Sequence, residues 1–418
     1  MNKYQIRSLH VIRKFVPDFL SVNAETMWQV VLGSMQNGHR PEIVCTAAGS
    51  EIKQESAEGI EVNRFRYKYP HWKLSESGKN ILDKFGGDPL SPDLIKYVKQ
   101  KKDIDLWHFH FEGRIPTRLR RLALKRHIPY LVSLYCEREI PANDETEMIE
   151  KVRKQIIDYG KVKDLFSGKN KLLSDAAGII CYDLSDYNRL KQQYPQKPLL
   201  LLNSGYIFDQ YQAAHLTDFR KKYHIPSTSE LILCDAPFMP ESNQIRLIEL
   251  AHHLNASSQP VHILLIGKLI SPAYLQVLRR KIAALKIEDQ VTIITDLDRH
   301  DSDLVKAYET ADYFILPALR FVQQRPILKA WTSRLPIIAH KFEGIEQLIQ
   351  QHKNGLLYEE DTLEALLAEL KFLRNNSEFR VRLIRNSCEA VKEDFSWEKI
   401  NEQIAEFYEQ LLRKKPEK

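Results

Sequence analysis

Short apolar runs that alternate with amphipathic segments constrain the fold of this 418-residue chain more than any other feature. Runs such as 42–46, 130–135 and 178–182 are typical of buried strands, whereas segments 25–36 and 118–126 have the residue spacing of helices. Because strands that alternate with helices favour a parallel sheet covered on both faces, the pattern predicts an α/β protein.

The same alternation restarts in the second half of the chain. The polar segment 226–229 precedes an apolar run at 231–234, and further strands are predicted at 261–266, 291–295 and 313–317. We therefore expect two doubly wound Rossmann-like sheets in tandem, with the joint near residues 204–228. Two such domains leave a ligand cleft at the carboxyl ends of their strands.

Composition and charge exclude several classes of function. Lysine and arginine exceed aspartate and glutamate by 61 − 55 = 6, which is too mild an excess to indicate a nucleic-acid partner. Glycine accounts for only 15 residues, and neither a dinucleotide fingerprint nor a P-loop motif occurs. A dinucleotide-dependent oxidoreductase is therefore disfavoured.

The cysteines and the apolar runs indicate a cytoplasmic protein. The five cysteines are widely spaced and include no C-x-x-C pair, which favours reduced thiols over disulfides or a zinc knuckle. The first residues lack the apolar core of a signal peptide, and no apolar run is long enough for a membrane span. We expect a cytoplasmic location, with at most peripheral contact at the inner face of the membrane.

Several local strings carry a family resemblance. They are Asn37-Gly38-His39, the segment DLWHFHF at 105–111, the segment YETADYFILP at 308–317, Asn354-Gly355-Leu356-Leu357 and Phe395-Ser396-Trp397. Their order and spacing across nearly the whole chain resemble the motifs of family 4 glycosyltransferases. The resemblance implies the GT-B fold, in which two Rossmann-like domains face a central cleft.

The resemblance also implies domain bounds and a function. It places an acceptor-side domain at residues 1–205, a donor-side domain at 206–385, and a C-terminal helix at 386–418 that returns to the first domain. It implies transfer of a hexose from a nucleotide sugar to a surface-glycan or glycoconjugate acceptor, including a lipid-linked one. The nucleotide sugar is then a substrate, and no resident cofactor is expected.

The donor-site motifs depart from the family pattern. The first loop, at 21–25, lacks the two glycines of the family. The Arg and Lys of the family's phosphate-binding segment align with Pro237 and Ser242, and its paired glutamates align with Phe321 and Lys329. Because cations and bare backbone amides stabilise a leaving diphosphate, these departures predict weak or absent independent transfer.

Other side chains are candidates to replace the missing donor contacts. The candidates for donor binding are Asn23, Lys268, Arg320, Arg325 and Lys329. The alternative is that the cations among them are ordinary solvated loop residues.

On the acceptor side, His110 and Glu137 are the candidate catalytic residues. His108 and His110 share one face of a predicted strand, and such a pair can ligate a metal, but the sequence places no third ligand. We therefore expect no metal, and the resemblance favours an acceptor-side role for His110. Glu137 follows a predicted strand and is a candidate base, or it pairs with Arg138.

Two basic segments each fit two alternative roles. The helix predicted at 118–127 fits an anionic membrane surface or an ordinary helix with a solvated basic face. Segment 65–73 interleaves cations with aromatics, which suits an acceptor or protein partner, or a plain strand-edge loop.

Two functions remain after these exclusions. The first is a family 4-like glycosyltransferase homologue with an eroded nucleotide-sugar site. The second is a non-catalytic GT-B accessory subunit that binds an acceptor or a partner glycosyltransferase.

Overall fold

The chain forms two compact units. The computed structural model describes residues 5–16, 22–135, 143–155, 157–160, 171–203, 205–206, 218–256, 260–295, 297, 301–320 and 324–413. Unit 1 comprises Met1–Gly205 together with Trp397–Lys418, and unit 2 comprises Tyr206–Ser396. Each unit is built around its own sheet.

The main sheet of unit 1 has the strand order β10-β9-β7-β6-β1-β2-β4-β3. Neighbouring strands are parallel except for β3 and β4, which form an antiparallel pair at one edge. The strands are β1 (Arg7–Lys14), β2 (Arg40–Thr46), β3 (Gln54–Ala57), β4 (Ile60–Phe65), β6 (Leu106–Phe109), β7 (Tyr130–Leu134), β9 (Gly178–Cys181) and β10 (Leu199–Leu201). A separate antiparallel pair joins β5 (His71–Trp72) to β8 (Ile157–Asp158).

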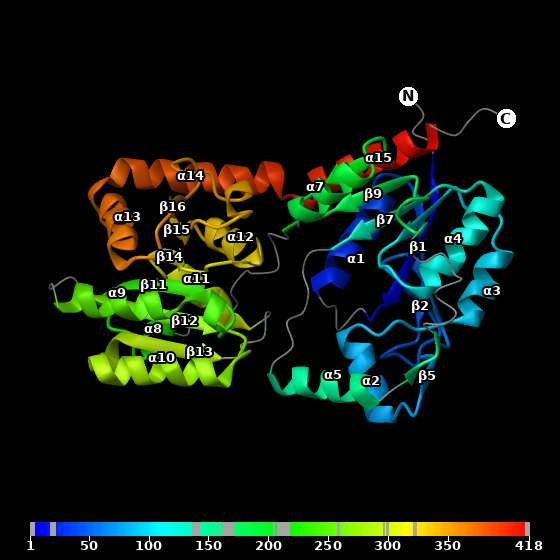
Figure 1. Cartoon of the computed structure of the whole chain (residues 1–418). Helices are drawn as coiled ribbons and strands as arrows, with labels where there is room; N and C mark the ends of the chain where they lie inside the picture. The colour runs from blue at the N-terminus through cyan, green and yellow to red at the C-terminus, as the bar shows by residue number, and fades with distance from the viewer. Residues whose placement is uncertain are drawn as a thin grey trace. The chain divides into compact units, whose positions relative to one another are not determined.

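The last helix of the chain packs in unit 1. The helices of this unit are α1 (Val22–Gln36), α2 (Glu76–Phe85), α3 (Pro92–Gln100), α4 (Arg114–Arg126), α5 (Asn143–Gln155), α7 (Leu184–Gln193) and α15 (Trp397–Arg413). Ile404 and Phe407 of α15 pack in one core cluster with Val30 of α1 and Leu131 of β7. Figure 1 shows α15, in red, beside the elements from the first half of the chain.

Unit 2 contains a fully parallel sheet in the order β13-β12-β11-β14-β15-β16. The strands are β11 (Glu230–Asp235), β12 (Val261–Gly267), β13 (Val291–Thr295), β14 (Tyr313–Leu316), β15 (Ile337–His340) and β16 (Leu356–Tyr358). The helices are α8 (Phe219–Lys222), α9 (Ile245–Ala256), α10 (Pro272–Leu285), α11 (Ser302–Thr310), α12 (Gln324–Thr332), α13 (Leu363–Asn375) and α14 (Ser377–Asp394). Figure 1 shows these helices on both faces of the sheet.

The apolar runs become strands because both faces of each sheet are covered. In β12 and β14, successive residues such as Ile263, Leu264, Phe314 and Ile315 have no exposed surface, so the strands need apolar side chains in both directions. The α/β class with parallel sheets and helices is therefore confirmed.

Local signals fix where several helices begin. Ser91 and Ser271 each accept a hydrogen bond from the backbone three residues later, and Pro92 and Pro272 follow them at the first helical position. Near the end of the chain, α14 stays in unit 2 and α15 begins unit 1 again at Trp397. Within the residues that the structure describes, every helix is too short or too polar to span a lipid bilayer.

Candidate functional site

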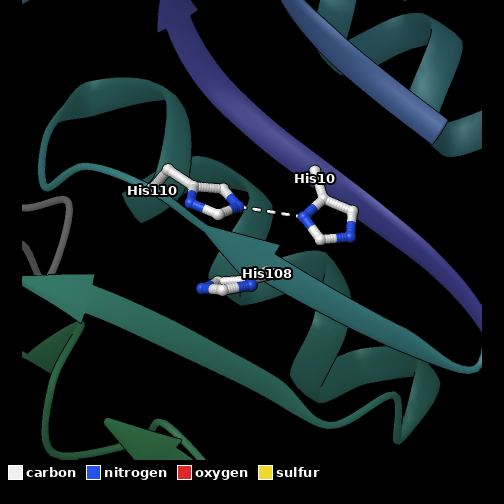
Figure 2. A group of neighbouring side chains, drawn as sticks. All are labelled: His10, His108 and His110. Carbon is white, nitrogen blue, oxygen red and sulfur yellow. Dashed lines mark hydrogen bonds between the residues drawn. The ribbon is translucent and has the colours of Figure 1, made fainter. Parts of the chain in front are cut away.

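Three histidines form a buried cluster in the middle of the unit 1 sheet. His10 lies on β1 directly opposite His108 on the neighbouring β6, and His110 follows the end of β6. Because His108 and His110 are two residues apart, their rings lie on the same face as the ring of His10 (Figure 2). His10 and His108 have no exposed surface, and His110 is 6% exposed.

Hydrogen bonds link these rings to one another and to hydroxyl groups. His10 Nδ1 lies 2.9 Å from His110 Nε2, the bond drawn in Figure 2, and His10 Nε2 lies 3.0 Å from the hydroxyl of Ser8. His110 Nδ1 lies 2.5 Å from the hydroxyl of Tyr135. The sequence thus placed His110 correctly beside His108, but the structure adds His10 as their third member.

His108 makes its own pair of hydrogen bonds. Its Nδ1 lies 2.7 Å from the hydroxyl of Tyr408 on α15, and its Nε2 lies 2.7 Å from the hydroxyl of Ser133 on β7. The His108 ring also stacks on that of His110, with ring centroids 3.8 Å apart. The last helix of the chain therefore helps to hold the cluster.

Burial keeps the three imidazoles neutral. Removal from water lowers the pKa of His10 from 6.5 to about 3 and lowers the pKa of His108 and of His110 well below the usual value. Neighbouring histidines add to the effect because two imidazolium charges would repel each other. At neutral pH each ring therefore carries one proton, on one of its two nitrogens.

The cluster meets one requirement of a metal site. One nitrogen from each ring can be chosen so that all three lie within 4.8 Å of one another. However, each of the six ring nitrogens already has a hydrogen-bond partner. A metal would have to replace a hydrogen bond at each ligand nitrogen, so the geometry is that of a hydrogen-bond network.

The other acceptor-side and first-loop candidates lie elsewhere. Glu137 and Arg138 lie outside the described residues. Asn23 is half-buried in the first turn of α1.

Several side chains of the two basic segments form hydrogen bonds within unit 1. In segment 65–73 the hydroxyls of Tyr67 and Tyr69 donate to Asp83 on α2, at 2.5 and 2.7 Å, whereas Trp72 is 68% exposed. In α4, Arg120 Nε donates to Asp175 at 2.7 Å, and Arg126 donates to backbone carbonyls. Several of these charges and hydroxyls therefore have structural partners.

In unit 2, backbone amides of the loop that follows β11 donate to carbonyl oxygens of the protein. This loop is segment 236–243, which the sequence resemblance predicts to occupy the place of the family's phosphate-binding segment. Ala236 N donates to Ile266 O at 2.9 Å, and Phe238 N donates to Lys268 O at 2.8 Å. Ser242 N and Asn243 N donate within the loop, at 3.0 and 3.1 Å. Pro237 and Pro240 have no N–H at all.

A close backbone contact holds this loop against β12. A Cβ atom at Gly267 would lie 1.9 Å from the carbonyl oxygen of Ala236, so only glycine fits there. The side chain of Gln244 donates to the carbonyls of Ala236 and Pro237, at 3.2 and 2.9 Å. The loop is therefore fixed on both sides.

Arg320, one of the candidate cations, is engaged by a carboxylate. Its guanidinium forms an ion pair with Glu241 of the loop, and this contact lowers the pKa of Glu241. Leu319 N also donates to Glu241 O at 2.9 Å. The Arg320 side chain is 72% exposed and that of Glu241 is 29% exposed, so solvent screens one side of the pair and its contribution to stability is small.

Lys329 faces a partly buried carboxylate of its own unit. Asp235, at the end of β11, is half-buried and accepts a hydrogen bond of 2.7 Å from the Tyr308 hydroxyl. Burial raises the pKa of Asp235, and the positive charge of Lys329 and the hydrogen bond from Tyr308 oppose that rise. The Lys329 Nζ lies 5.8 Å from the centre of the Tyr308 ring.

Lys329 also lines a hollow of about 230 Å³ in unit 2. The lining comes from Tyr206 and from residues of α11 and of the C-terminal part of α12 and the turn after it. Lys268, exposed after β12, and Arg325, half-buried in the first turn of α12, do not line it, and neither does Arg320. Of these four candidate cations, Lys329 alone lines the hollow.

Comparisons with known proteins match the second half of the chain to a family of transferases. Residues 216–390, all within unit 2, match the family model described as "Glycosyl transferases group 1". An "Uncharacterized glycosyltransferase" of Haemophilus influenzae is 31% identical over 121 residues, which cover 29% of this chain and 33% of the relative. A "Putative colanic acid biosynthesis glycosyltransferase WcaL" of Salmonella typhimurium is 29% identical over 136 residues, 31% of this chain and 33% of the relative.

A solved structure covers nearly the whole chain. The crystal structure of a glycosyltransferase from Rickettsia africae aligns over 99% of this chain and 100% of its own, with a TM-score of 0.65 and 19% identity. The fold is GT-B. The matched segments of this chain span about a third of the length of the two curated relatives. The comparisons thus show a GT-B fold, and its second unit matches the family model of the group 1 glycosyl transferases.

Proposed function

We propose that this chain is a family 4-like glycosyltransferase homologue of surface-glycan or glycoconjugate assembly, with an eroded nucleotide-sugar site. Its independent hexosyl transfer is weak or absent, and it works in the cytoplasm. The match of unit 2 to the group 1 transferases supports the transferase ancestry. The likeness to a putative colanic acid enzyme supports a role in polysaccharide assembly.

The state of the loop at 236–243 carries the proposal of an eroded site. A leaving diphosphate needs several preorganised N–H groups and cations within hydrogen-bond distance. Two residues of this loop are prolines, and the amides of four others donate to carbonyls of the protein. The loop therefore has few N–H groups to offer to a phosphate.

The candidate cations support the same conclusion. Arg320 pairs with Glu241, and Lys329 is attracted to the half-buried Asp235. Both positive charges are thereby partly neutralised by carboxylates of unit 2. Hydrogen bonds to charged groups contribute about 1.5–3 kcal/mol each, so the loss of several weakens donor binding by orders of magnitude.

Calorimetric titration with UDP-glucose and with GDP-mannose tests the proposal. We expect dissociation constants weaker than about 1 mM for both, a scale of about −4 kcal/mol. A parallel titration with inorganic pyrophosphate reports on the phosphate contacts alone and should also show no binding below that limit. Micromolar affinity for either sugar nucleotide would overturn the eroded-site proposal.

The same features favour a second candidate function, that of a non-catalytic GT-B accessory subunit. In such a subunit, the Arg320–Glu241 pair stabilises the fold and does not bind a donor. The same holds for the amides of segment 236–243 that donate to protein carbonyls. Its partner would be a catalytic glycosyltransferase, or it would present the glycan or lipid-linked acceptor at the membrane surface. Copurification of a glycosyltransferase in stoichiometric amount from the native cell would support this function, and a purified chain that transfers hexose alone would exclude it.

A further inference from the structure

Two hydrogen-bond chains run through the histidine cluster. The first runs from Ser8 through His10 and His110 to the hydroxyl of Tyr135. The second runs from Tyr408 through His108 to Ser133. Tyr135 follows β7 and is half-buried, whereas Ser8, His10 and His108 are completely buried.

Neutral imidazoles allow only two complete arrangements of protons in the first chain. Each ring has one N–H donor and one bare nitrogen acceptor. If His10 carries its proton on Nδ1, it donates to His110 Nε2, and His110 must then carry its proton on Nδ1 and donate to Tyr135. If His10 carries its proton on Nε2, it donates to Ser8, and every other bond of the chain reverses.

The two arrangements give Tyr135 opposite roles. In the first, Ser8 donates to His10 and the Tyr135 oxygen accepts from His110, so the Tyr135 hydroxyl proton is available to another group. In the second, that proton is donated to His110, and the oxygen can only accept from elsewhere. A mixed arrangement would set two N–H groups or two bare nitrogens against each other between His10 and His110, which are 2.9 Å apart.

We propose that Ser8 and His10 are positioning residues that set, through His110, whether the Tyr135 hydroxyl donates or accepts a hydrogen bond. The first hydrogen-bond chain couples the tautomer of His10, at the centre of the sheet, to the hydroxyl of Tyr135, at the carboxyl end of β7. No net charge moves, because both arrangements contain the same neutral groups. A polar partner of Tyr135, such as a sugar hydroxyl, would select one arrangement by the role it needs.

The neutrality of the cluster makes such a switch feasible. Charging one ring would be opposed by burial, which lowers the pKa of all three histidines. Inverting the chain only requires each proton to move along its own hydrogen bond and the two hydroxyls to rotate. This inference concerns the residues of unit 1 alone, and it does not depend on whether unit 2 binds a donor.

Two conservative variants should favour opposite proton arrangements in the first hydrogen-bond chain. Ser8→Ala removes the partner of His10 Nε2, and a buried N–H without an acceptor is less tolerable than a bare nitrogen. We expect this variant to hold the proton on Nδ1 of both His10 and His110. Tyr135→Phe removes the partner of His110 Nδ1, so for the same reason we expect the proton on Nε2 of both rings.

Side-chain ¹⁵N NMR at neutral pH identifies the protonated nitrogen of each histidine in the folded protein. The expected result is that His10 and His110 carry the proton on the same type of nitrogen in every sample, with opposite types in Ser8→Ala and Tyr135→Phe. A matched control, Ser133→Ala, alters the surroundings of His108 and should preserve the agreement between His10 and His110.

Three results would overturn the proposal. They are different nitrogens protonated on His10 and His110, the same tautomer of His110 in both variants, and an imidazolium in the cluster at neutral pH. A purely structural role for Ser8 would leave the His110 tautomer unchanged, since Ser8 bonds to His10 and not to His110. A retained ¹⁵N backbone spectrum shows that each variant is folded.

Discussion

The candidate clusters of the two units satisfy their polar groups in different ways. In unit 1 the polar groups at the centre of the sheet are neutral histidines and hydroxyls, and they satisfy one another through hydrogen bonds. In unit 2 the polar groups lie where strands end, and they are charged: Asp235 with Lys329, and Glu241 with Arg320.

The difference bears on the kind of ligand that each cluster would suit. A neutral network holds hydroxyl groups in defined positions and needs no counter-charge, so it remains compatible with a polyhydroxylated ligand. An anionic donor needs uncompensated cations. In unit 2, carboxylates of the protein already attract Arg320 and Lys329, two of the cations proposed for donor binding.

The pH dependence of stability should separate the units most strongly. A histidine with a folded-state pKa below its unfolded value of 6.5 binds protons more readily when unfolded, so stability falls as the pH drops below 6.5. Three such histidines lie in unit 1, each contributing up to about 1.4 kcal/mol per pH unit, or about 4 kcal/mol together. For His10 the loss continues to about pH 3.

Hydrogen exchange of β1 and β6 against β11 and β12, between pH 7 and pH 5, measures this difference. Unit 2 has one histidine of this type among those described, His262, whose pKa burial lowers to about 4. A His262→Gln variant should weaken the dependence in unit 2 and leave that of unit 1 unchanged. Equal losses of protection in both units of the wild type would contradict the account.

Gly267→Ala should destabilise unit 2 by about 3 kcal/mol. The added Cβ would meet the backbone carbonyl of Ala236, which cannot move without displacing the loop after β11. Chemical denaturation followed by fluorescence measures the change. A Gly267→Ala protein as stable as the wild type would show that this loop is not rigid.

Gly33→Ala in α1 is the matched control in unit 1. There the added Cβ would meet the side chain of Asn401 on α15 rather than backbone. Shortening that side chain in the double variant Gly33→Ala/Asn401→Ala should restore part of the lost stability. If the double variant regained no stability, the α1–α15 contact would be as rigid as the contact between Gly267 and Ala236 in unit 2.

Lys329→Glu, which introduces the residue type that the family resemblance predicts at this position, should destabilise unit 2 by about 2 kcal/mol. The new carboxylate would replace the positive charge that stabilises the half-buried Asp235 with a negative one. Thermal unfolding measures the effect, and Lys329→Met serves as the neutral control with a smaller loss. A stabilised Lys329→Glu protein with improved donor affinity would show that Lys329 is not a counter-charge for Asp235.

Glu241→Gln should have the smallest effect on stability, below about 1 kcal/mol, because its ion pair with Arg320 is partly exposed. It releases the Arg320 guanidinium, so we expect affinity for inorganic pyrophosphate to rise severalfold. Glu249→Gln is the control, since Glu249 pairs with Arg246 and Lys281 elsewhere in unit 2. An unchanged affinity in Glu241→Gln would show that the pair does not limit anion binding.

Much of the fold could be predicted from the sequence because its signals are local. The apolar run at 130–135 became β7 at Tyr130–Leu134, and the segment at 25–36 lies within α1 at Val22–Gln36. These elements are recognised by the spacing of apolar residues and by their bounding turns.

The partners in both candidate sites could not be predicted in this way. His10 lies opposite His108 only because β1 pairs with β6 in one particular register, and the two residues are far apart in the chain. The same holds for Lys329 and Asp235, which meet only after the unit 2 sheet forms. The Ser8-x-His10 spacing was the one available signal for the third histidine, since alternate residues of a strand share a face.

A crystal structure of the chain soaked with UDP-glucose tests the central claim most directly. The account predicts that Arg320 stays paired with Glu241 and that no diphosphate is held by Lys268, Arg320 or Lys329. A diphosphate bound by any of these three side chains, with Glu241 displaced, would contradict it and would indicate an intact donor site.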